Sequence, residues 1–292
     1  MIAASCGTTT TVQPFDEVPA TVTPLAPATL AIEGRLHRRW GLRIATGDAR
    51  VADVAGMEFS ERHGLLAVTR GGQWLSFDLR GGTLAGIHAV GVAATRGAAG
   101  APTSLVTVYG ERTFVAFGGA HPVIARYALG ACGAASTAVP WITVTGGGEL
   151  IVVQGAYTYL GIVGRHAGDG GALVLPYARR AVALAGRNPL GASARTLVAA
   201  SNPARIVPEI IVAHQAGHGG RTDVTLVPVD AWGDVQGGPA RPQTPLATLP
   251  RAPSAMASQY DRRGKTTLVI LAYPGPSTGT LDLYAFDTDV AL

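Results

Sequence analysis

The sequence predicts an all-β protein built from a repeated pair of strands, and three observations lead to this prediction. The 292 residues include 39 glycines and 19 prolines, while only 14% of the residues are charged. Such a composition is typical of a chain with many turns. No segment sustains a helical period, and short apolar runs alternate with glycine-containing turns. A hydrophobic fraction of 47% is enough to bury a sizeable core without disulfides.

The clearest strand pair lies within residues 54–79. Apolar runs at 65–69 and 74–79 are separated by the turn Arg70-Gly71-Gly72, which is a hairpin pattern. The pattern returns at 113–117 with 123–129, 150–154 with 159–163, 209–213 with 224–229, and 267–272 with 281–286. The copies are spaced much like four-stranded propeller blades, which take about 40–50 residues each. An isolated hairpin cannot bury both faces, whereas a ring of such units covers them.

The repeat therefore predicts a single β-propeller over residues 29–292, with six blades as the best count. Five copies are clear, and residues 172–177, 181–185 and 196–200 supply a sixth in irregular form. We expect residues 30–44 to pair with the C-terminal strands and close the ring. A β-sandwich with long loops is the structural alternative.

Residues 1–28 are rich in Thr, Pro and Ala, and we expect them to form a flexible tail. The sequence Ala3-Ala4-Ser5-Cys6 resembles the cleavage site of a bacterial lipoprotein, in which Cys6 becomes the lipidated first residue. No charged or apolar leader precedes it, so an ordinary tail cysteine is the alternative. Cys6 and Cys132 could also pair, and neither belongs to a CxxC motif. The lipoprotein interpretation predicts an exported protein in the periplasm or on the outer surface, with Cys6 as its membrane contact.

The positive charge does not predict nucleic-acid binding. The net charge of +4 comes from 23 basic and 19 acidic residues. The arginines occur as singlets and pairs, without a basic stripe interleaved with aromatic residues.

Two stretches resemble the bacterial propeller family named for the esterase-like activity of phytase. Residues 53–79 are similar to the opening blade of that family. The closing blade is similar to residues 255–257, 261–265 and the strands TTLVILA and LDLYAFD. Residues 102–129 and 141–163 match the middle blades in outline. The resemblance implies a propeller fold, a phosphoesterase or esterase activity, and a calcium-binding acidic site.

The chain departs from that family where acidic residues would be expected. Thr69 precedes Arg70-Gly71 in place of an aspartate, and the positions of channel glutamates and of an acidic segment hold Thr103-Ser104, Pro140-Trp141, Ser254 and residues 272–275. Calcium needs several oxygen ligands at one point, and phosphate chemistry needs such a metal or a cluster of Arg and Lys. We therefore expect no cofactor, with calcium only if the family's site survives.

Asp53, Glu58 and Arg70 are the candidates for the channel. Glu58 as a lone carboxylate could also be structural or solvated, and Asp53 suits a turn cap. His214, His218 and Asp223 are weaker candidates for a metal site, because zinc usually takes three or four ligands. The alternative for HQAGH is a solvated hairpin loop. No serine is singled out as a catalytic nucleophile, and no catalytic residue is assigned.

Two functional classes follow from these observations. The loss of the acidic residues favours a non-catalytic binding or scaffold module with a protein partner, such as an accessory subunit of a larger assembly. The alternative is a divergent phosphoesterase or esterase of the phytase-like kind.

Overall fold

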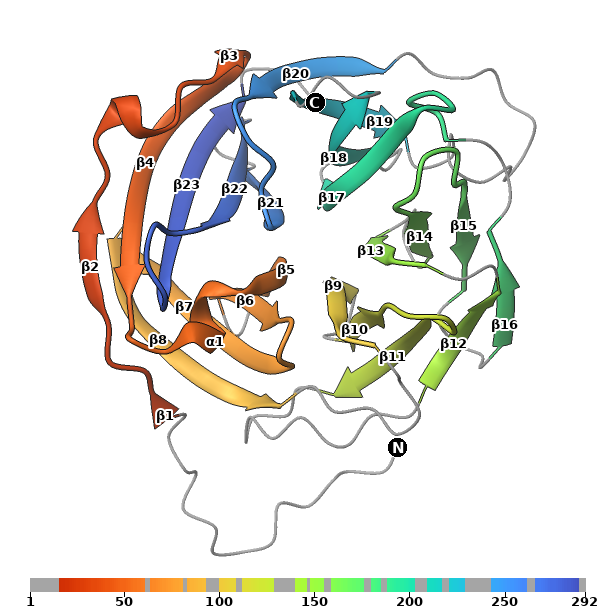
Figure 1. Ribbon diagram of the computed structural model, residues 1–292, viewed down its shortest axis with the longest axis horizontal. Coiled ribbons are helices and arrows are strands. Elements are labelled where there is room, and N and C mark those ends of the chain that lie inside the picture. The colour runs from red at the N-terminus through yellow and green to blue at the C-terminus, as the bar shows by residue number, and fades with distance from the viewer. Residues whose placement is uncertain are drawn as a thin grey trace, which may run out of the picture.

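Five sheets surround a central axis like the blades of a propeller (Figure 1). The computed structural model describes residues 16–60, 64–80, 83–92, 100–108, 112–128, 140–145, 148–154, 159–175, 180–184, 188–202, 209–216, 221–228, 243–261 and 266–288. All-β architecture and a single propeller are thus confirmed. Among these residues no helix is long and apolar enough to cross a membrane.

The first two blades each contain four consecutive strands and one added strand at the outer edge. Blade I consists of β5 (Val54–Ser60), β6 (Gly64–Thr69), β7 (Gln73–Arg80) and β8 (Thr83–Val92), with β1 (Asp16–Glu17) outside β8. Blade II consists of β9 (Pro102–Val108), β10 (Arg112–Phe117), β11 (Val123–Ala128) and β12 (Pro140–Thr145), with β16 (Arg180–Ala183) outside β12. The β12–β16 pair is parallel.

Blade III is smaller than its neighbours. Its sheet holds three strands, β13 (Leu150–Gln154), β14 (Leu160–Gly164) and β15 (Gly171–Val174). The chain that follows β15 leaves the blade and contributes β16 to blade II. Within the described ranges, the outer part of blade III therefore lacks the strand that its neighbours have there.

The last two blades again hold five strands each. Blade IV consists of β17 (Ala194–Asn202), β18 (Glu209–Ala216), β19 (Thr222–Pro228) and β20 (Thr244–Leu249), with β3 (Glu33–Gly34) outside β20. Blade V consists of β21 (Ala255–Asp261), β22 (Thr266–Pro274), β23 (Thr280–Thr288) and β4 (Leu36–Ala45), with β2 (Thr21–Pro24) outside β4.

The N-terminal strand β4 closes the ring. It pairs antiparallel with β23 along its length, which confirms the expected pairing with the C-terminal strands for residues 36–44, while residues 33–34 pair with β20 of blade IV. The residues before β4 add short outer strands to blades I, V and IV. Residues 16–24, placed in the tail by composition, thus contain two extended strands, and β2 is exposed along its length.

The prediction of six blades is wrong, because the structure has five. The five clear copies of the repeat are the hairpins β6–β7, β10–β11, β13–β14, β18–β19 and β22–β23. The three segments assigned to a sixth blade belong instead to β15 of blade III, β16 of blade II and β17 of blade IV. They have strand composition, but each completes a different sheet.

The hydrophobic core lies between neighbouring blades. Trp74 of blade I packs edge-on against Tyr127 of blade II, with ring centroids 5.3 Å apart. The cluster between blades III and IV is the smallest of those formed by the described residues; its fully buried members are Ile151, Val153, Val163, Ile210, Val212 and Val227. The interface next to the truncated blade thus has the least apolar burial.

Two short helical turns join these strands. The 3-10 helix η1 (Pro27–Thr29) follows β2. Helix α1 (Ala49–Ala52) joins β4 to β5, and its N-cap Asp48 accepts a hydrogen bond of 2.9 Å from the backbone N–H of Arg50. The helix leads directly to Asp53 and the innermost strand of blade I.

Candidate functional site

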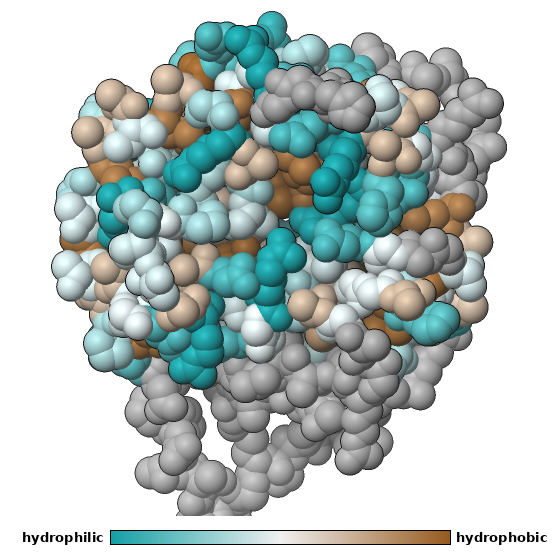
Figure 2. Space-filling model, in the orientation of Figure 1, coloured by the Kyte–Doolittle hydropathy of each residue, from teal (hydrophilic) through white to brown (hydrophobic). Residues whose placement is uncertain are grey.

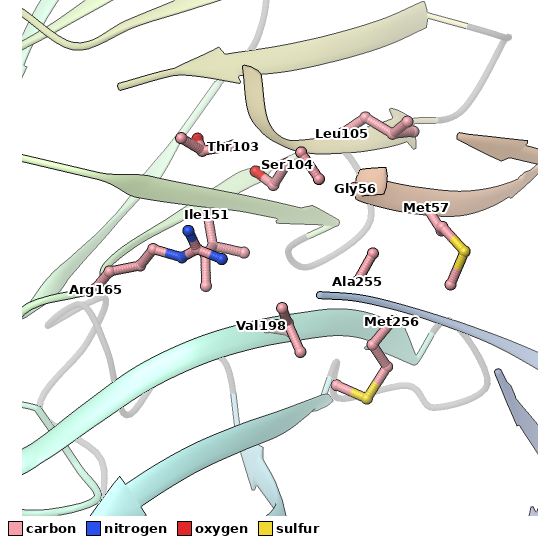
Figure 3. A pocket seen from close by; sticks show the side chains of 12 residues that line it. Gly56, Met57, Thr103, Ser104, Leu105, Ile151, Arg165, Val198, Ala255 and Met256 are labelled. Carbon is pink, nitrogen blue, oxygen red and sulfur yellow. The ribbon is translucent and has the colours of Figure 1, made fainter. Parts of the chain in front are cut away.

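The central channel is filled by side chains. The innermost strands β5, β9, β13, β17 and β21 enclose a cavity of about 10 Å³ (Figure 3). A single water molecule needs about 10–15 Å³ of such space. The wall is mostly apolar and includes Met57, Ile151 and Met256, while Arg165 is its charged member. A ligand of ordinary size would therefore bind at an end of the channel.

Hydroxyl groups join blades II and III inside the channel. Thr103 Oγ1 donates to the carbonyl of Leu150 at 2.7 Å, and the N–H of Val152 donates to Ser104 Oγ at 2.8 Å. Thr103 and Ser104 stand where the resemblance implied a glutamate, and here they satisfy the backbone of the next blade. They are structural contacts between blades.

Glu58 lies near the end of β5 and is buried, with 7% of its surface exposed. The N–H of Phe59 donates to its Oε1 at 3.1 Å, and Ser201 Oγ donates to its Oε2 at 3.2 Å. Burial raises the pKa of Glu58 to about 8, although the hydrogen bonds from Phe59 and Ser201 oppose the shift. The carboxyl group is therefore mostly protonated at neutral pH.

Ser201 connects this buried carboxyl group to two further blades. The N–H of Gln154 in blade III donates to Ser201 Oγ at 2.8 Å, and Ser258 Oγ of blade V donates to the Ser201 carbonyl. One serine of blade IV thus contacts the innermost strands of three other blades. The arrangement explains why a lone carboxyl group is tolerated there, and it supports a structural role for Glu58.

The other end of the channel, where the innermost strands begin, carries arginines. Arg165 follows β14 in the turn toward β15, and only 6% of it is exposed. Its Nη1 donates to Glu149 Oε2 at 2.7 Å, and its Nη2 donates to the carbonyl of Leu197 in blade IV. Its Nε is buried and has no hydrogen-bond partner among the described residues. Figure 3 shows the guanidinium directed into the channel.

Local turn chemistry fixes the position of Arg165. The N–H of His166 donates to Asp169 Oδ2 at 2.9 Å, and Gly168 adopts a positive φ of 84°. A glycine suits that conformation because it has no Cβ to clash. The turn therefore closes tightly and leaves Arg165 at its first position, beside the channel.

Arg70 and Arg195 complete this basic cluster. Arg70 occupies the β6–β7 turn, and Arg195 is an exposed residue near the start of β17. Burial lowers the pKa of Arg165; Glu149 opposes this shift, and the charges of Arg70 and Arg195 add to it. Burial opposes ionisation of Glu149, but Arg165 and the charges of Arg70 and Arg195 hold its pKa below the ordinary value. We use the term channel mouth for the five residues Asp53, Arg70, Glu149, Arg165 and Arg195.

Asp53 and Arg70 lie together at the mouth. The N–H of Arg70 donates to the Asp53 carbonyl at 2.9 Å, and Arg70 Nε lies 3.4 Å from Asp53 Oδ1. The two side chains are 41% and 53% exposed, so their ion pair is solvated and weak. Glu58 is five residues further along β5, about 16 Å away at 3.3 Å per residue. The three channel candidates therefore divide between the two ends.

On the face seen in Figure 2, hydrophilic side chains gather around the centre of the ring next to an apolar patch. Helix α1, which leads into Asp53, lies on this same face in Figure 1. A shallow basic mouth over an apolar floor is suited to bind the oxyanion of a small solute. Guanidinium groups match the geometry of carboxylate and phosphate oxygens.

The sequence missed Arg165, Glu149 and Arg195, although one signal was available. Arg70 directly follows β6, and Arg165 directly follows β14, so both occupy the residue after the second strand of a blade. Alignment of the hairpin copies by this strand would have paired the two arginines. The contribution of Arg195, in contrast, depends on how blade IV packs beside blade III.

The weaker metal candidates do not form a metal site in the described part of the chain. His214 and Asp223 are directly opposed on β18 and β19, while His218 lies outside the described residues. His214 Nε2 lies 3.0 Å from Thr225 Oγ1. No group of three or more His, Cys, Asp or Glu side chains that could hold a metal occurs among the described residues.

Calcium does not fit the described channel residues either. The carboxylates Glu58 and Glu149 lie at opposite ends of the innermost strands, and Glu149 is bound to Arg165. Thr103 and Ser104 are engaged with the backbone of blade III. The oxygen cage that calcium prefers is not assembled by these side chains. Cys6 and Cys132 lie outside the described residues.

Comparisons with known proteins extend over most of the chain at low identity. No family model and no curated protein matches the sequence. A putative oxidoreductase (glucose dehydrogenase) from Thermus thermophilus is similar with 16% identity and a TM-score of 0.41, covering 90% of this chain and 88% of that one. A putative gluconolactonase has 12% identity and a TM-score of 0.43, covering 93% and 94%. A calcium structure of a Trichoderma reesei Carbohydrate-Active Enzymes Family AA12 protein has 8% identity and a TM-score of 0.49, covering 94% and 99%. The activities of these proteins do not transfer to this chain at such identity.

Proposed function

We propose that this protein is a binding module whose channel mouth takes a small solute bearing a carboxylate or phosphate group. The observation that carries the proposal is the cluster of Arg70, Arg165 and Arg195 around Glu149. Three guanidinium groups face one tightly engaged carboxylate, with Asp53 more exposed at the edge. An added anion would relieve the repulsion among the arginines.

The buried arginine is held ready for such a ligand. Arg165 is fixed at both terminal nitrogens, by Glu149 and by the Leu197 carbonyl. A guanidinium already held in place loses little conformational entropy when a ligand binds. The apolar floor formed by Met57, Met256 and Val198 reduces solvent screening beside it.

The mouth supports binding more directly than catalysis. The hydroxyls of Thr103 and Ser104 in the channel are engaged in backbone hydrogen bonds. The protonated Glu58 lies at the opposite end. Hydrolysis of phosphate or carboxylate esters is the alternative, and the experiment must distinguish it from binding alone.

The test is calorimetric titration of the purified protein with inorganic phosphate and with acetate. We expect saturable binding that weakens at high salt. Arg70→Ala and Arg195→Ala should each weaken it about fivefold, since one solvated charge contact contributes about 1 kcal/mol. Arg39→Ala is the matched control because Arg39 is 52% exposed on β4 of blade V, outside the mouth. Equal losses in all three variants would contradict a site at the mouth.

The same preparations should be assayed on aryl phosphates and short aryl esters, with and without calcium. The binding proposal predicts that the wild-type protein turns over these substrates no faster than Arg165→Ala does. Turnover that depends on Arg165 would replace this proposal with the hydrolase alternative.

Export, a lipid on Cys6 and a protein partner complete the proposal as predictions from the sequence. Mass spectrometry of the native N-terminus decides the lipid, because lipidation adds the mass of the acyl chains to Cys6.

A further inference from the structure

Among the described residues, the truncation of blade III leaves part of blade IV uncovered. Blade IV extends outward through β19, β20 and β3, whereas blade III ends at β15 (Figure 1). Near the channel, Ile210, Val212 and Val227 on the facing side of blade IV pack against Val153 and Val163 of blade III. Further outward, none of the described residues of blade III lines the corresponding surface.

The uncovered surface carries a row of polar residues. His214 is directly opposite Asp223, Asp223 is opposite Thr248, and Thr248 is opposite Glu33. Directly opposed residues in a sheet project from the same face. The row therefore runs across β18, β19, β20 and β3 on the side that faces blade III, in line with the even-numbered Ile210 and Val212.

A groove of about 380 Å³ follows this row, and its lining includes Glu33, Arg35, His214, Asp223, Thr225 and Thr248. Pockets for small organic ligands typically measure about 300–1,000 Å³. Pro245, opposite Thr225, adds an apolar wall. Two carboxylates and one guanidinium give the groove a negative balance on a chain whose net charge is +4.

His214 carries an unsatisfied nitrogen in this groove. Only 7% of His214 is exposed, and its Nε2 lies 3.0 Å from Thr225 Oγ1. Its Nδ1 is buried without a hydrogen-bond partner among the described residues. Burial lowers the pKa of His214 and the charge of Asp223 only partly opposes this, so the ring is neutral at pH 7. His214 therefore lines the groove without adding a positive charge to it.

Asp223 is held on the same face of the sheet, directly opposite His214. Thr248 Oγ1 donates to Asp223 Oδ1 at 2.8 Å, which orients the carboxylate. The site thus offers carboxylate acceptors at Asp223 and, further along the row, at Glu33. Hydrogen-bond donors that also carry positive charge satisfy such a set best.

We propose that this groove binds a small organic cation, with an ammonium or guanidinium group against the Asp223 carboxylate, next to His214, and its carbon chain along Pro245. Glu33 adds attraction from the edge strand β3, and Arg35 beside it disfavours long polycations. The site is independent of the channel mouth and takes ligands of the opposite charge.

The probes are 1,4-diaminobutane and agmatine, with 1,4-butanediol as a neutral ligand of similar length. We expect saturable binding of the two cations in calorimetric titration, and none of the diol at the same concentration. Asp223→Asn should weaken binding of the cations at least tenfold, and Glu33→Gln about threefold. Glu17→Gln is the matched control, since it removes an equal charge from an exposed residue of blade I.

Nitrogen NMR of the histidine rings provides a second measurement. It uses the wild-type protein, so it does not depend on whether a variant folds. The cations should shift the Nδ1 resonance of His214, which a long-range proton–nitrogen spectrum resolves. Three results would each overturn the proposal. Asp223→Asn and Glu17→Gln could weaken binding of the cations equally, 1,4-butanediol could bind as well as the cations, or the His214 resonance could stay unchanged at saturation.

Discussion

Individual buried residues of the channel and of the blade IV groove differ mainly in whether their polar groups are satisfied. Ser201 satisfies Glu58, whereas the Nε of Arg165 and the Nδ1 of His214 lack partners among the described residues. Buried polar groups without partners are costly. Arg165 and His214 each line one of the two proposed sites, and Glu58 is the position at which titration affects stability.

The buried Glu58 predicts a pH-dependent stability. The folded protein retains a proton to about pH 8, whereas the ordinary carboxyl group releases it near 4.5. Between these values the unfolded state binds fewer protons, so rising pH favours unfolding, by up to about 1.4 kcal/mol per pH unit. Glu58→Gln mimics the protonated form and should remove this component of the pH dependence. Chemical denaturation of both proteins at pH 5 and pH 8 measures the difference.

Glu17→Gln is the control for this comparison, because Glu17 is exposed. It should keep the pH dependence of the wild type. If Glu58→Gln also keeps it, Glu58 is ionised in the folded protein and the structural role assigned to it is wrong.

Arg165 illustrates what sequence could not provide at this scale. Asp53, Glu58 and Arg70 were singled out because they lie in the best-defined hairpin. The functional value of Arg165 depends on Glu149 and on the Leu197 carbonyl, which arrive from different strands. Such convergence is a tertiary property. Thr69 is the reverse case: its Oγ1 accepts a hydrogen bond of 3.1 Å from the N–H of Gln73, so it shapes the turn before Arg70.

Among the elements, the hairpins were predictable and the blade boundaries were not. Each of the five clear sequence copies is an adjacent strand pair, because the alternation of apolar residues and the turn glycines are local signals. The segments at 172–177, 181–185 and 196–200 carry the same local signal. Their distribution over three sheets follows from sheet pairing, which local pattern does not encode.

The closure element β4 supports a prediction about stability. Arg43 Nε and Nη2 donate to the two oxygens of Asp282 on β23 at 2.7 and 2.8 Å, and the Asp282 side chain is 2% exposed. Asp282→Asn leaves Arg43 without its partner and should lower the free energy of unfolding by about 2 kcal/mol. Chemical denaturation measures the change.

Asp287 provides a matched control on the same strand pair. Its carboxylate lies 3.5 Å from Arg39, and the two side chains are 35% and 52% exposed. Asp287→Asn should change the free energy of unfolding by less than about 0.5 kcal/mol. Equal effects of the two substitutions would mean that the buried pair does not stabilise the closure.

At the scale of the whole molecule, a ring of five sheets presents two chemically different sites. The channel mouth is basic, and the groove beside the truncated blade III is acidic. The groove lies where β16 leaves blade III, whereas the mouth lies where the β14–β15 turn brings Arg165 to the channel. The fold class was predictable from the composition and from the repeated strand pairs. The two sites depend on how many blades there are and on how many strands each blade holds.

The most direct test of an anion site at the channel mouth is the anomalous scattering of arsenate, a phosphate analogue, in crystals of this protein. The account predicts an anomalous peak at the channel mouth, with arsenate oxygens within hydrogen-bond distance, about 3 Å, of the exposed guanidinium nitrogens of Arg70 or Arg195. The peak should be absent in crystals of Arg165→Ala grown with the same arsenate concentration. An empty mouth in the wild type, with arsenate ordered elsewhere or nowhere, would contradict the proposed function.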